Sequence, residues 1–201
     1  MLKKIEAYLP KNQQEEMDRT LMLDFLRRHD DAYLRTNRLA HMTASAWVTD
    51  RTRSRVLMVY HNIYDSWSWC GGHADGERDL LQVALRECRE ETGLEDVRPV
   101  TEDIFSLECL TVDGHEKRGA YVSSHLHLNV TYLLEADSRA ELHICAGENS
   151  GVRWFTPEEA LRASTEPWFV RRIYSKLNDR LRDFCTAEII TAGRAGAGGM
   201  R

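Results

Sequence analysis

The stretch GGHADGERDLLQVALRECREETGL, residues 71–94, is the part of the sequence that decides the fold. Its apolar side chains recur at helical spacing, at Leu80, Leu81, Ala84, Leu85 and Cys88. This periodicity predicts an amphipathic helix over residues 79–92, with a glycine-rich loop before it. Gly93 follows the last periodic residue and is expected to end the helix.

Three carboxylates share one stripe of this predicted helix. At roughly 100° per residue, Glu87, Glu90 and Glu91 fall together beside the apolar stripe. Like charges at these spacings repel by roughly a few tenths of a kcal/mol per pair, so a compensating cation is expected. Clustered carboxylate oxygens suit Mg²⁺ or Mn²⁺. The alternative is a solvated acidic face balanced by Arg86 and Arg89.

The residues around the carboxylates follow a longer pattern. Gly72 is followed by five residues, one further position, seven residues and then RECREETGL at residues 86–94. This run closely resembles the Nudix box, which has Glu at that further position and ends in Arg-Glu-U-x-Glu-Glu-x-Gly-U, where U is aliphatic. Two positions depart from the signature. Arg78 stands where the early glutamate is expected, with Glu77 one position away, and Cys88 stands at the first U.

The resemblance implies a fold and a reaction. The fold is an α/β one, a Nudix-like α/β/α sandwich with a mixed sheet over residues 40–165, extended by an N-terminal and a C-terminal helix. The reaction is hydrolysis of the diphosphate bridge in a nucleoside diphosphate linked to another moiety. The box glutamates are expected to hold Mg²⁺ or Mn²⁺, which neutralises the phosphate oxygens and activates a water.

The resemblance also assigns residues to the site. Nudix enzymes often draw a further acidic residue from a later loop, and Glu148 is the best-placed candidate, although an ordinary turn residue is the alternative. The expected metal ligands are Glu87, Glu90, Glu91 and Glu148, and Arg86 joins them in the catalytic set, where it orients carboxylates. Contacts to the substrate are expected from Gly71, Gly72, His73 and His127.

Alternation in residues 125–134 predicts a strand with two different faces. Leu126 and Leu128 belong to one face, while His125 and His127 belong to the other. A histidine pair at this spacing fits a metal site, a phosphate contact or a hydrogen-bonded sheet face. We favour the hydrogen-bonded face, because no third nitrogen or thiolate ligand is spaced to join the pair.

Two other functions fit parts of the pattern. Isopentenyl-diphosphate isomerase shares the fold, and the segment from Cys70 to His73 partly resembles the sequence around its catalytic cysteine. A non-catalytic Nudix-like nucleotide-binding module is the second alternative. The intact Arg86-Glu87 and Glu90-Glu91 pairs favour a hydrolase over both.

Composition limits the partners. The chain has 201 residues, of which 42% are hydrophobic, and is expected to form one domain over residues 1–188 with a flexible tail at 189–201. A net charge of −5 argues against a nucleic-acid partner. Five cysteines without a CxxC motif indicate neither a disulfide framework nor a cysteine zinc site. No membrane span is predicted, and the cysteine usage favours a reduced cytosol, so a cytoplasmic location is expected. The small nucleotide substrate is what the resemblance to the Nudix family implies.

Periodicity predicts the elements around the box. Alternating or apolar runs predict strands at residues 42–48, 55–60, 104–111 and 152–155. A helix is expected to begin at Thr156 and Pro157, with Glu159 completing a capping box, and the last helix begins at Pro167. An N-terminal helix, for packing or a homodimer, has a single apolar face made of Met17, Leu21, Met22, Phe25 and Leu26.

Overall fold

The structure of the chain is a computed structural model that describes residues 1–117 and 119–197. Its longer strands are β1 (Ala40–Asp50), β2 (Val56–His61), β6 (Ser106–Val112), β9 (His125–Ala136) and β10 (Asn149–Phe155). The shorter ones are β3 (Ser66–Ser68), β4 (Cys70–His73), β5 (Val97–Pro99), β7 (His115–Lys117) and β8 (Ala120–Val122). The helices are α1 (Leu2–Ala7), α2 (Gln13–Leu26), α3 (Leu80–Thr92), α4 (Pro157–Ala163), α5 (Pro167–Phe169), the π-helical turn η1 (Val170–Tyr174) and α6 (Ser175–Ala197).

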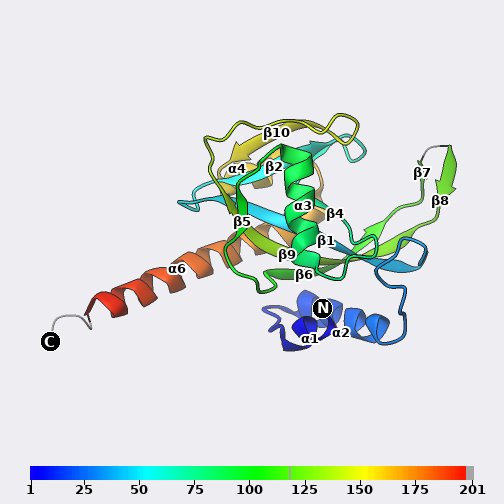
Figure 1. Cartoon of the computed structure of the whole chain (residues 1–201), viewed down its shortest axis with the longest axis horizontal. Coiled ribbons are helices and arrows are strands. Elements are labelled where there is room, and N and C mark those ends of the chain that lie inside the picture. The colour runs from blue at the N-terminus through cyan, green and yellow to red at the C-terminus, as the bar shows by residue number, and fades with distance from the viewer. Residues whose placement is uncertain (118, 198–201) are drawn as a thin grey trace.

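One mixed sheet organises the described residues. Its order is β10-β2-β1-β9-β5, with β3 paired to β2, β4 to β1 and β6 to β9. The strands β7 and β8 form a separate hairpin that projects from the body (Figure 1). At the centre, β1 and β9 run parallel, from the pair Ala40 and Leu126 to the pair Asp50 and Ala136. The sheet is therefore mixed, as the sequence predicts.

The two faces of the central strands serve two cores. Met42 and Leu128 belong to the larger core, whereas Trp47 and Leu133 belong to the second core. The helix α3 adds its apolar stripe to the larger core, and α4 and the start of α6 pack in the second. Because both faces are covered, β1 is buried along its whole length. The three layers confirm the predicted α/β/α sandwich (Figure 1).

The N-terminal helix is present as α2, but its predicted face is wrong at two positions. Met17 is 62% exposed and Leu21 is 41% exposed. The buried face instead contains Glu15, Met22 and Leu23, which follow an i, i+7, i+8 pattern. The cause is a glutamate that turns inward because basic partners lie there. The homodimer expected from this helix stays a prediction.

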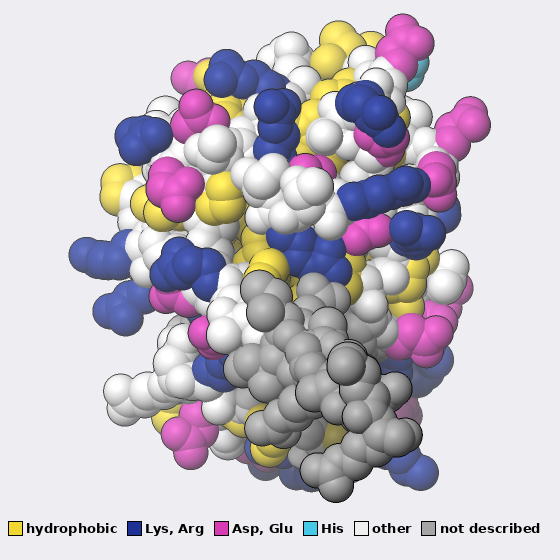
Figure 2. Space-filling model, turned by 90° about the vertical axis from the view of Figure 1, so that its left-hand side faces the viewer, with side chains coloured by type: hydrophobic (Ala, Val, Ile, Leu, Met, Phe, Trp, Pro, Cys, Tyr) yellow, Lys and Arg dark blue, Asp and Glu magenta, His cyan; other side chains and the backbone are white. Residues whose placement is uncertain are grey.

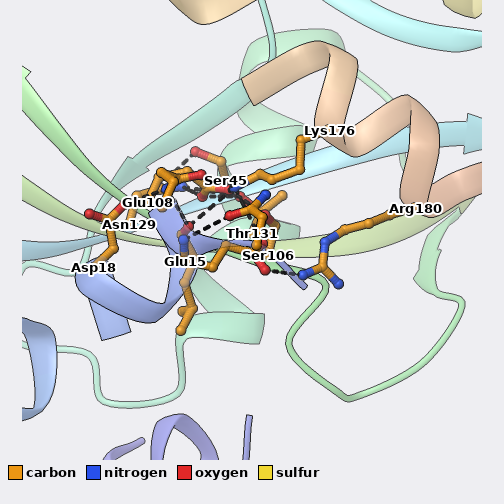
Figure 3. A network of polar contacts seen from close by, with 12 residues as sticks. Glu15, Asp18, Ser45, Ser106, Glu108, Asn129, Thr131, Lys176 and Arg180 are labelled. Carbon is orange, nitrogen blue, oxygen red and sulfur yellow. Dashed lines mark hydrogen bonds and ion pairs between the residues drawn. The ribbon is translucent and has the colours of Figure 1, made fainter. Parts of the chain in front are cut away.

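Those partners belong to a buried charge network that joins α2, β6 and α6 (Figure 3). Lys176 Nζ lies 2.9 Å from Glu108 Oε1 and 3.3 Å from Glu15 Oε1, and Arg180 also pairs with Glu15. Asn129 extends the network by donating to Glu108 Oε2 over 3.0 Å. Burial alone would raise the pKa of Glu15, but the charge of Lys176 and further donors hold it below its usual value. The network therefore keeps Glu15 ionised and fastens the N-terminal helices to α6.

We expect Lys176→Met to lower the free energy of unfolding by about 3 kcal/mol, because Glu15 and Glu108 then lose a buried cation. Lys11→Met is the matched control, since Lys11 forms an exposed pair with Asp183 over 2.8 Å and should contribute less than about 1 kcal/mol. Urea unfolding at neutral pH measures both losses.

The pH dependence checks the cause of the Lys176→Met loss. A lowered pKa stabilises the folded chain above the ordinary glutamate pKa, and this gain is lost as the pH falls through the folded value. The difference between wild type and Lys176→Met should therefore shrink in acid. Equal losses in the Lys176 and Lys11 variants at neutral pH would contradict the network.

The C-terminal region confirms one prediction and has a longer last helix than the sequence suggests. Thr156 and Glu159 form the predicted capping box, with a proline at the first turn of α4. The helix α6 continues to Ala197, into the segment from residue 189 that the sequence predicts as a flexible tail. Alanine and arginine favour helix, and an isolated glycine reduces helix stability by only about 1 kcal/mol. Residues 198–201 of the predicted tail lie outside the described residues.

The surface shown in Figure 2 carries both signs of charge. On the face in Figure 2, Lys and Arg side chains are interspersed with Asp and Glu. Among the described residues, no helix combines the length and the apolar character that crossing a bilayer requires. The cytoplasmic location stays a prediction.

Candidate active site

Local sequence signals fix both ends of α3. The Asp79 side chain accepts a hydrogen bond from the Leu81 N–H over 3.2 Å and caps the first turn. Gly93 has φ +73° and donates to the Arg89 carbonyl over 2.9 Å. A Cβ at Gly93 would lie 2.8 Å from the His143 side chain. The predicted helix and its glycine end are confirmed.

The glycines of β4 lie against the carboxylates of α3. A Cβ at Gly72 would collide with the Glu87 carboxyl group, so only glycine leaves room for this carboxylate. Glu87 Oε1 accepts a hydrogen bond from Arg86 Nη2 over 2.7 Å. The same nitrogen of Arg86 lies 3.3 Å from the His73 carbonyl oxygen. Arg86 thus holds Glu87 in place on the backbone of β4.

Glu91 lies deeper than its neighbours. It is 6% exposed, and its Oε2 accepts a hydrogen bond from the Gly71 N–H over 3.2 Å. Burial raises the pKa of Glu91 to about 8, and the negative charges of Glu87 and Glu148 add to the effect. Burial also raises the pKa of Glu87, with Glu90 and Glu148 adding to the rise against the opposing Arg86. The raised pKa values show that the positive groups of the chain near Glu87 and Glu91 do not balance the burial and mutual repulsion of their carboxylates.

Glu148 lies close enough to these carboxylates to shift their pKa values, although it belongs to a different part of the chain. Asn149 holds the loop in place, because its Nδ2 donates to the Glu91 carbonyl over 2.8 Å. Its Oδ1 accepts from the Cys145 N–H over 3.2 Å, which closes the turn before Glu148. Sequence reasoning missed Asn149. The signal was its position directly after the candidate ligand.

Arg78, at the altered box position, and its neighbour Glu77 both make contacts away from the box carboxylates. The Arg78 guanidinium lies over the Tyr33 ring, 5.0 Å from its centroid. Glu77 Oε1 accepts a hydrogen bond from the Asp79 N–H over 2.8 Å, at the start of α3. Arg78 thus serves packing against the N-terminal segment, and Glu77 serves the helix start.

The oxygen-only donor set fits a hard divalent cation. Carboxylates with raised pKa values repel one another, and a cation among them turns that repulsion into attraction. Glu87 has its cradle at Gly72, and Glu91 is fixed by the Gly71 N–H. The donor chemistry of these residues therefore fits Mg²⁺ or Mn²⁺, although their oxygens do not converge as closely as the nitrogens of His41, His73 and His127.

Cys70 does not have the character of a reactive thiol. It is fully buried, and its contact with Cys88 together with burial and the nearby Glu91 raises the pKa of its thiol well above the usual range. A catalytic cysteine needs a thiolate, which a lowered pKa provides. The partial resemblance to isopentenyl-diphosphate isomerase gains no support from this position.

His73 and His127 lie on the other side of the sheet from Glu87. In the pairing of β4 with β1, Gly72 lies opposite Ala44 on the α3 face, and His73 lies opposite Thr43 on the other face. The His73 ring lies 4.8 Å from the His127 ring, between centroids. The hydrogen bonding predicted for the His125 and His127 face is present, because the two Nε2 atoms lie 3.3 Å apart. Further ring nitrogens, which the sequence did not indicate, lie near His127. These nitrogens come from β1 and β4, which sequence spacing does not reveal.

The comparisons with known proteins agree with this geometry. The family model described as NUDIX domain matches residues 39–177. The chain belongs to the Nudix family. Membership, together with the box on α3, makes it a Nudix-type pyrophosphohydrolase. No curated protein matches the sequence.

Solved Nudix structures share the fold at low identity. A C. elegans Ap4A hydrolase has a TM-score of 0.52 and 18% identity, over 73% of this chain and 98% of its own. A Clostridium perfringens Nudix hydrolase has a TM-score of 0.52 and 20% identity, over 74% and 99% of the two chains. The Nudix domain of Shewanella oneidensis NrtR, complexed with ADP ribose, has a TM-score of 0.50 and 16% identity, over 79% and 97%.

The raised pKa of Glu91 predicts how stability responds to pH in EDTA. A carboxyl with its pKa raised to about 8 stabilises the folded chain below its ordinary pKa, and this contribution is lost as the pH rises through the folded value. Wild type should lose on the order of a few kcal/mol between about pH 6 and about pH 9. Glu91→Gln should lose much less, and urea unfolding at both pH values measures this.

Glu95→Gln is the control, because Glu95 follows the box helix and is exposed. Its loss of stability with pH should equal that of wild type. A Glu91→Gln variant that loses as much stability as wild type would show that the titrating group lies elsewhere.

Proposed function

We propose that the protein hydrolyses the diphosphate bridge of a nucleoside diphosphate linked to another moiety and requires Mg²⁺ or Mn²⁺. The observation that carries the proposal is the gathering of Glu87, Glu91 and Glu148 from two distant segments, with mutual effects that raise the pKa values of Glu87 and Glu91. Glu90 adds an exposed carboxylate on the same helix. Clustered carboxylates with raised pKa values are typical of a functional site, and here they would bind the cation that contacts the phosphates of the substrate.

Each residue of the proposed site then has a definite role. A bound divalent cation supplies neutralising charge and a more acidic water. Arg86 positions the Glu87 carboxylate, and the Gly71 N–H positions Glu91. Gly72 contributes the space that Glu87 occupies. Glu90 is proposed as a further ligand, and Glu148, on the opposing loop, as the base or ligand that faces the attacking water.

The substrate class is supported by the ligands of similar proteins. Among the structures similar to this chain, one is an Ap4A hydrolase and another is a Nudix domain complexed with ADP ribose. ADP ribose is itself a nucleoside diphosphate linked to a second moiety. His73 lies on the face of β4 opposite the carboxylates, so the His73 and His127 rings are not among the proposed phosphate contacts.

A substrate screen tests the function. With Mg²⁺ present, we expect hydrolysis of at least one compound among ADP-ribose, dinucleoside polyphosphates and nucleoside triphosphates, and none in EDTA. Glu90→Gln should lower kcat at least roughly a hundredfold, because it removes a charge and leaves an exposed side chain of the same size. Glu95→Gln should keep the wild-type kcat.

Two results would contradict the proposal. One is full activity of Glu90→Gln, which would remove the acidic stripe from the reaction. The other is turnover of isopentenyl diphosphate, included in the same screen, without hydrolysis of any nucleotide.

Glu148→Gln tests the contribution of the loop. We expect kcat to fall at least about tenfold while KM changes less, because the lost carboxylate acts on the attacking water more than on substrate binding. Glu141→Gln is the matched control from the same segment, since Glu141 is exposed and lies 3.8 Å from His143. Equal kcat values in both variants would make Glu148 an ordinary turn residue.

A further inference from the structure

Three histidines from three strands meet on the face of the sheet opposite α3. His41, His73 and His127 each place one ring nitrogen within 4.8 Å of the others, and they are the one such group of possible metal ligands among the described residues. Their ring centroids lie 4.8 to 5.2 Å apart. Register brings them together, since His41 lies directly opposite His127 and Thr43 lies opposite His73.

A fourth histidine stands beside this cluster. His125 Nε2 lies 3.3 Å from His127 Nε2, and the His125 ring lies 4.9 Å from the His41 ring, between centroids. Zn–N bonds of about 2.0–2.1 Å at tetrahedral angles place two ligand nitrogens about 3.3–3.4 Å apart. The two Nε2 atoms share a hydrogen bond at this distance, and the same separation suits two imidazoles on one zinc ion.

Backbone carbonyls orient two of the rings. His41 Nδ1 lies 3.1 Å from the Asn37 carbonyl oxygen, so Nδ1 carries the proton and donates it. His41 is 4% exposed, and its Nε2 is a buried acceptor that no hydrogen-bond partner reaches in the described part of the chain. His125 Nδ1 likewise lies 2.8 Å from the Ser123 carbonyl oxygen. Metal-bound histidines characteristically donate their second nitrogen to a carbonyl or carboxylate in this way.

The charge state suits a metal better than an anion. The ring nitrogens of His41, His73 and His127 converge within 4.8 Å, so a proton on each ring would place like charges side by side in a partly buried position. Neutral imidazole is the form that binds metal, whereas phosphate is attracted by the protonated form. Asp75 lies close to the cluster, and its carboxylate accepts hydrogen bonds of 2.5 and 2.6 Å from Arg35. The positive charge of Arg35 is therefore paired with Asp75.

We propose that His41, His73 and His127 bind a divalent transition-metal ion, for which Zn²⁺ fits best, with His125 or a water as the fourth ligand. Imidazole ligands favour zinc over magnesium, which prefers oxygen. The site is separate from the box carboxylates, because His73 and Gly72 face opposite sides of β4. The ion would join β1, β4 and β9 and so fasten the four-residue strand β4.

Zinc retention by the full chain tests the proposal. The protein is stripped with EDTA, incubated with Zn²⁺ in the presence of excess Mg²⁺, dialysed, and its zinc counted by mass spectrometry. Wild type should retain about one zinc per chain. The double variant His41→Gln with His127→Gln should retain less than about a fifth of that amount. The control His29→Gln, whose ring stacks on Phe25 instead, should equal wild type.

The visible absorption spectrum of the Co²⁺-loaded wild type tests the site even if the His41→Gln, His127→Gln double variant does not fold. Wild type loaded with Co²⁺ should give the intense visible bands of tetrahedral cobalt with nitrogen ligands. A weak octahedral spectrum would overturn the proposal. So would wild type that retains no zinc, or a folded double variant that retains as much as wild type.

Two further arms distinguish a histidine zinc site from zinc bound at the box and from an anion site. Zinc retention should persist in Glu90→Gln and Glu91→Gln, so it stands even where the proposed hydrolysis fails. Retention that follows those glutamates and not the histidines would assign the ion to the box and overturn the proposal. Inorganic phosphate that raises the Tm through His41 and His127, in a chain that retains no zinc, would make the cluster an anion site and also overturn it.

Discussion

Eleven consecutive residues of β1 lie in parallel register with eleven of β9. The histidine cluster and the buried charge network around Glu108 both depend on this pairing. Because side chains alternate along a strand, one register aligns His41 with His127, Thr43 with Asn129 and Trp47 with Leu133 on a single face. That face therefore runs from histidines through a hydrogen-bonded middle to an apolar core. A slip of β9 by one residue would send His127, Asn129 and Leu133 to the α3 face and leave their β1 partners without them.

Two kinds of buried glutamate show how the chain handles charge. Glu15 and Glu108 are fully buried, yet Lys176 and Arg180 supply matching cations from α6. Glu91 is nearly as buried but accepts a hydrogen bond from the Gly71 N–H beside other carboxylates, with no matching cation among its described contacts. The first arrangement satisfies its charges internally and holds helices in place. The second leaves a charge deficit that a cation from solution can fill.

Local features were predictable from the sequence, because local interactions produce them. The box helix ends at Gly93, and Thr156 with Glu159 forms the capping box of α4, since each signal needs only a few neighbouring residues. The alternation at residues 125–134 correctly separated two faces of β9. The sandwich itself came from the resemblance of the box and not from periodicity.

Long-range features were not predictable in this way. The inward turn of Glu15 depends on Lys176 and Arg180, which lie more than 150 positions away in the sequence. The histidine cluster needs the registers of β4 and β9 on β1 together, and a single strand pattern contains neither. The position of Glu148 near α3 involves long-range contacts, among them the hydrogen bonds from Asn149 Nδ2 to the Glu91 carbonyl and from the Asn62 N–H to the Glu148 carbonyl.

The strand β4 gives consecutive residues to two different chemical environments. Gly72 lies under the Glu87 carboxylate, and the next residue, His73, turns its ring to the histidines on the far face. The four residues of β4 are held by one antiparallel pairing with β1, so a ligand that displaced the strand from one face would displace the residues of the other face as well. Thermodynamic linkage would make such an effect reciprocal: each face would change the affinity of the other by the same factor.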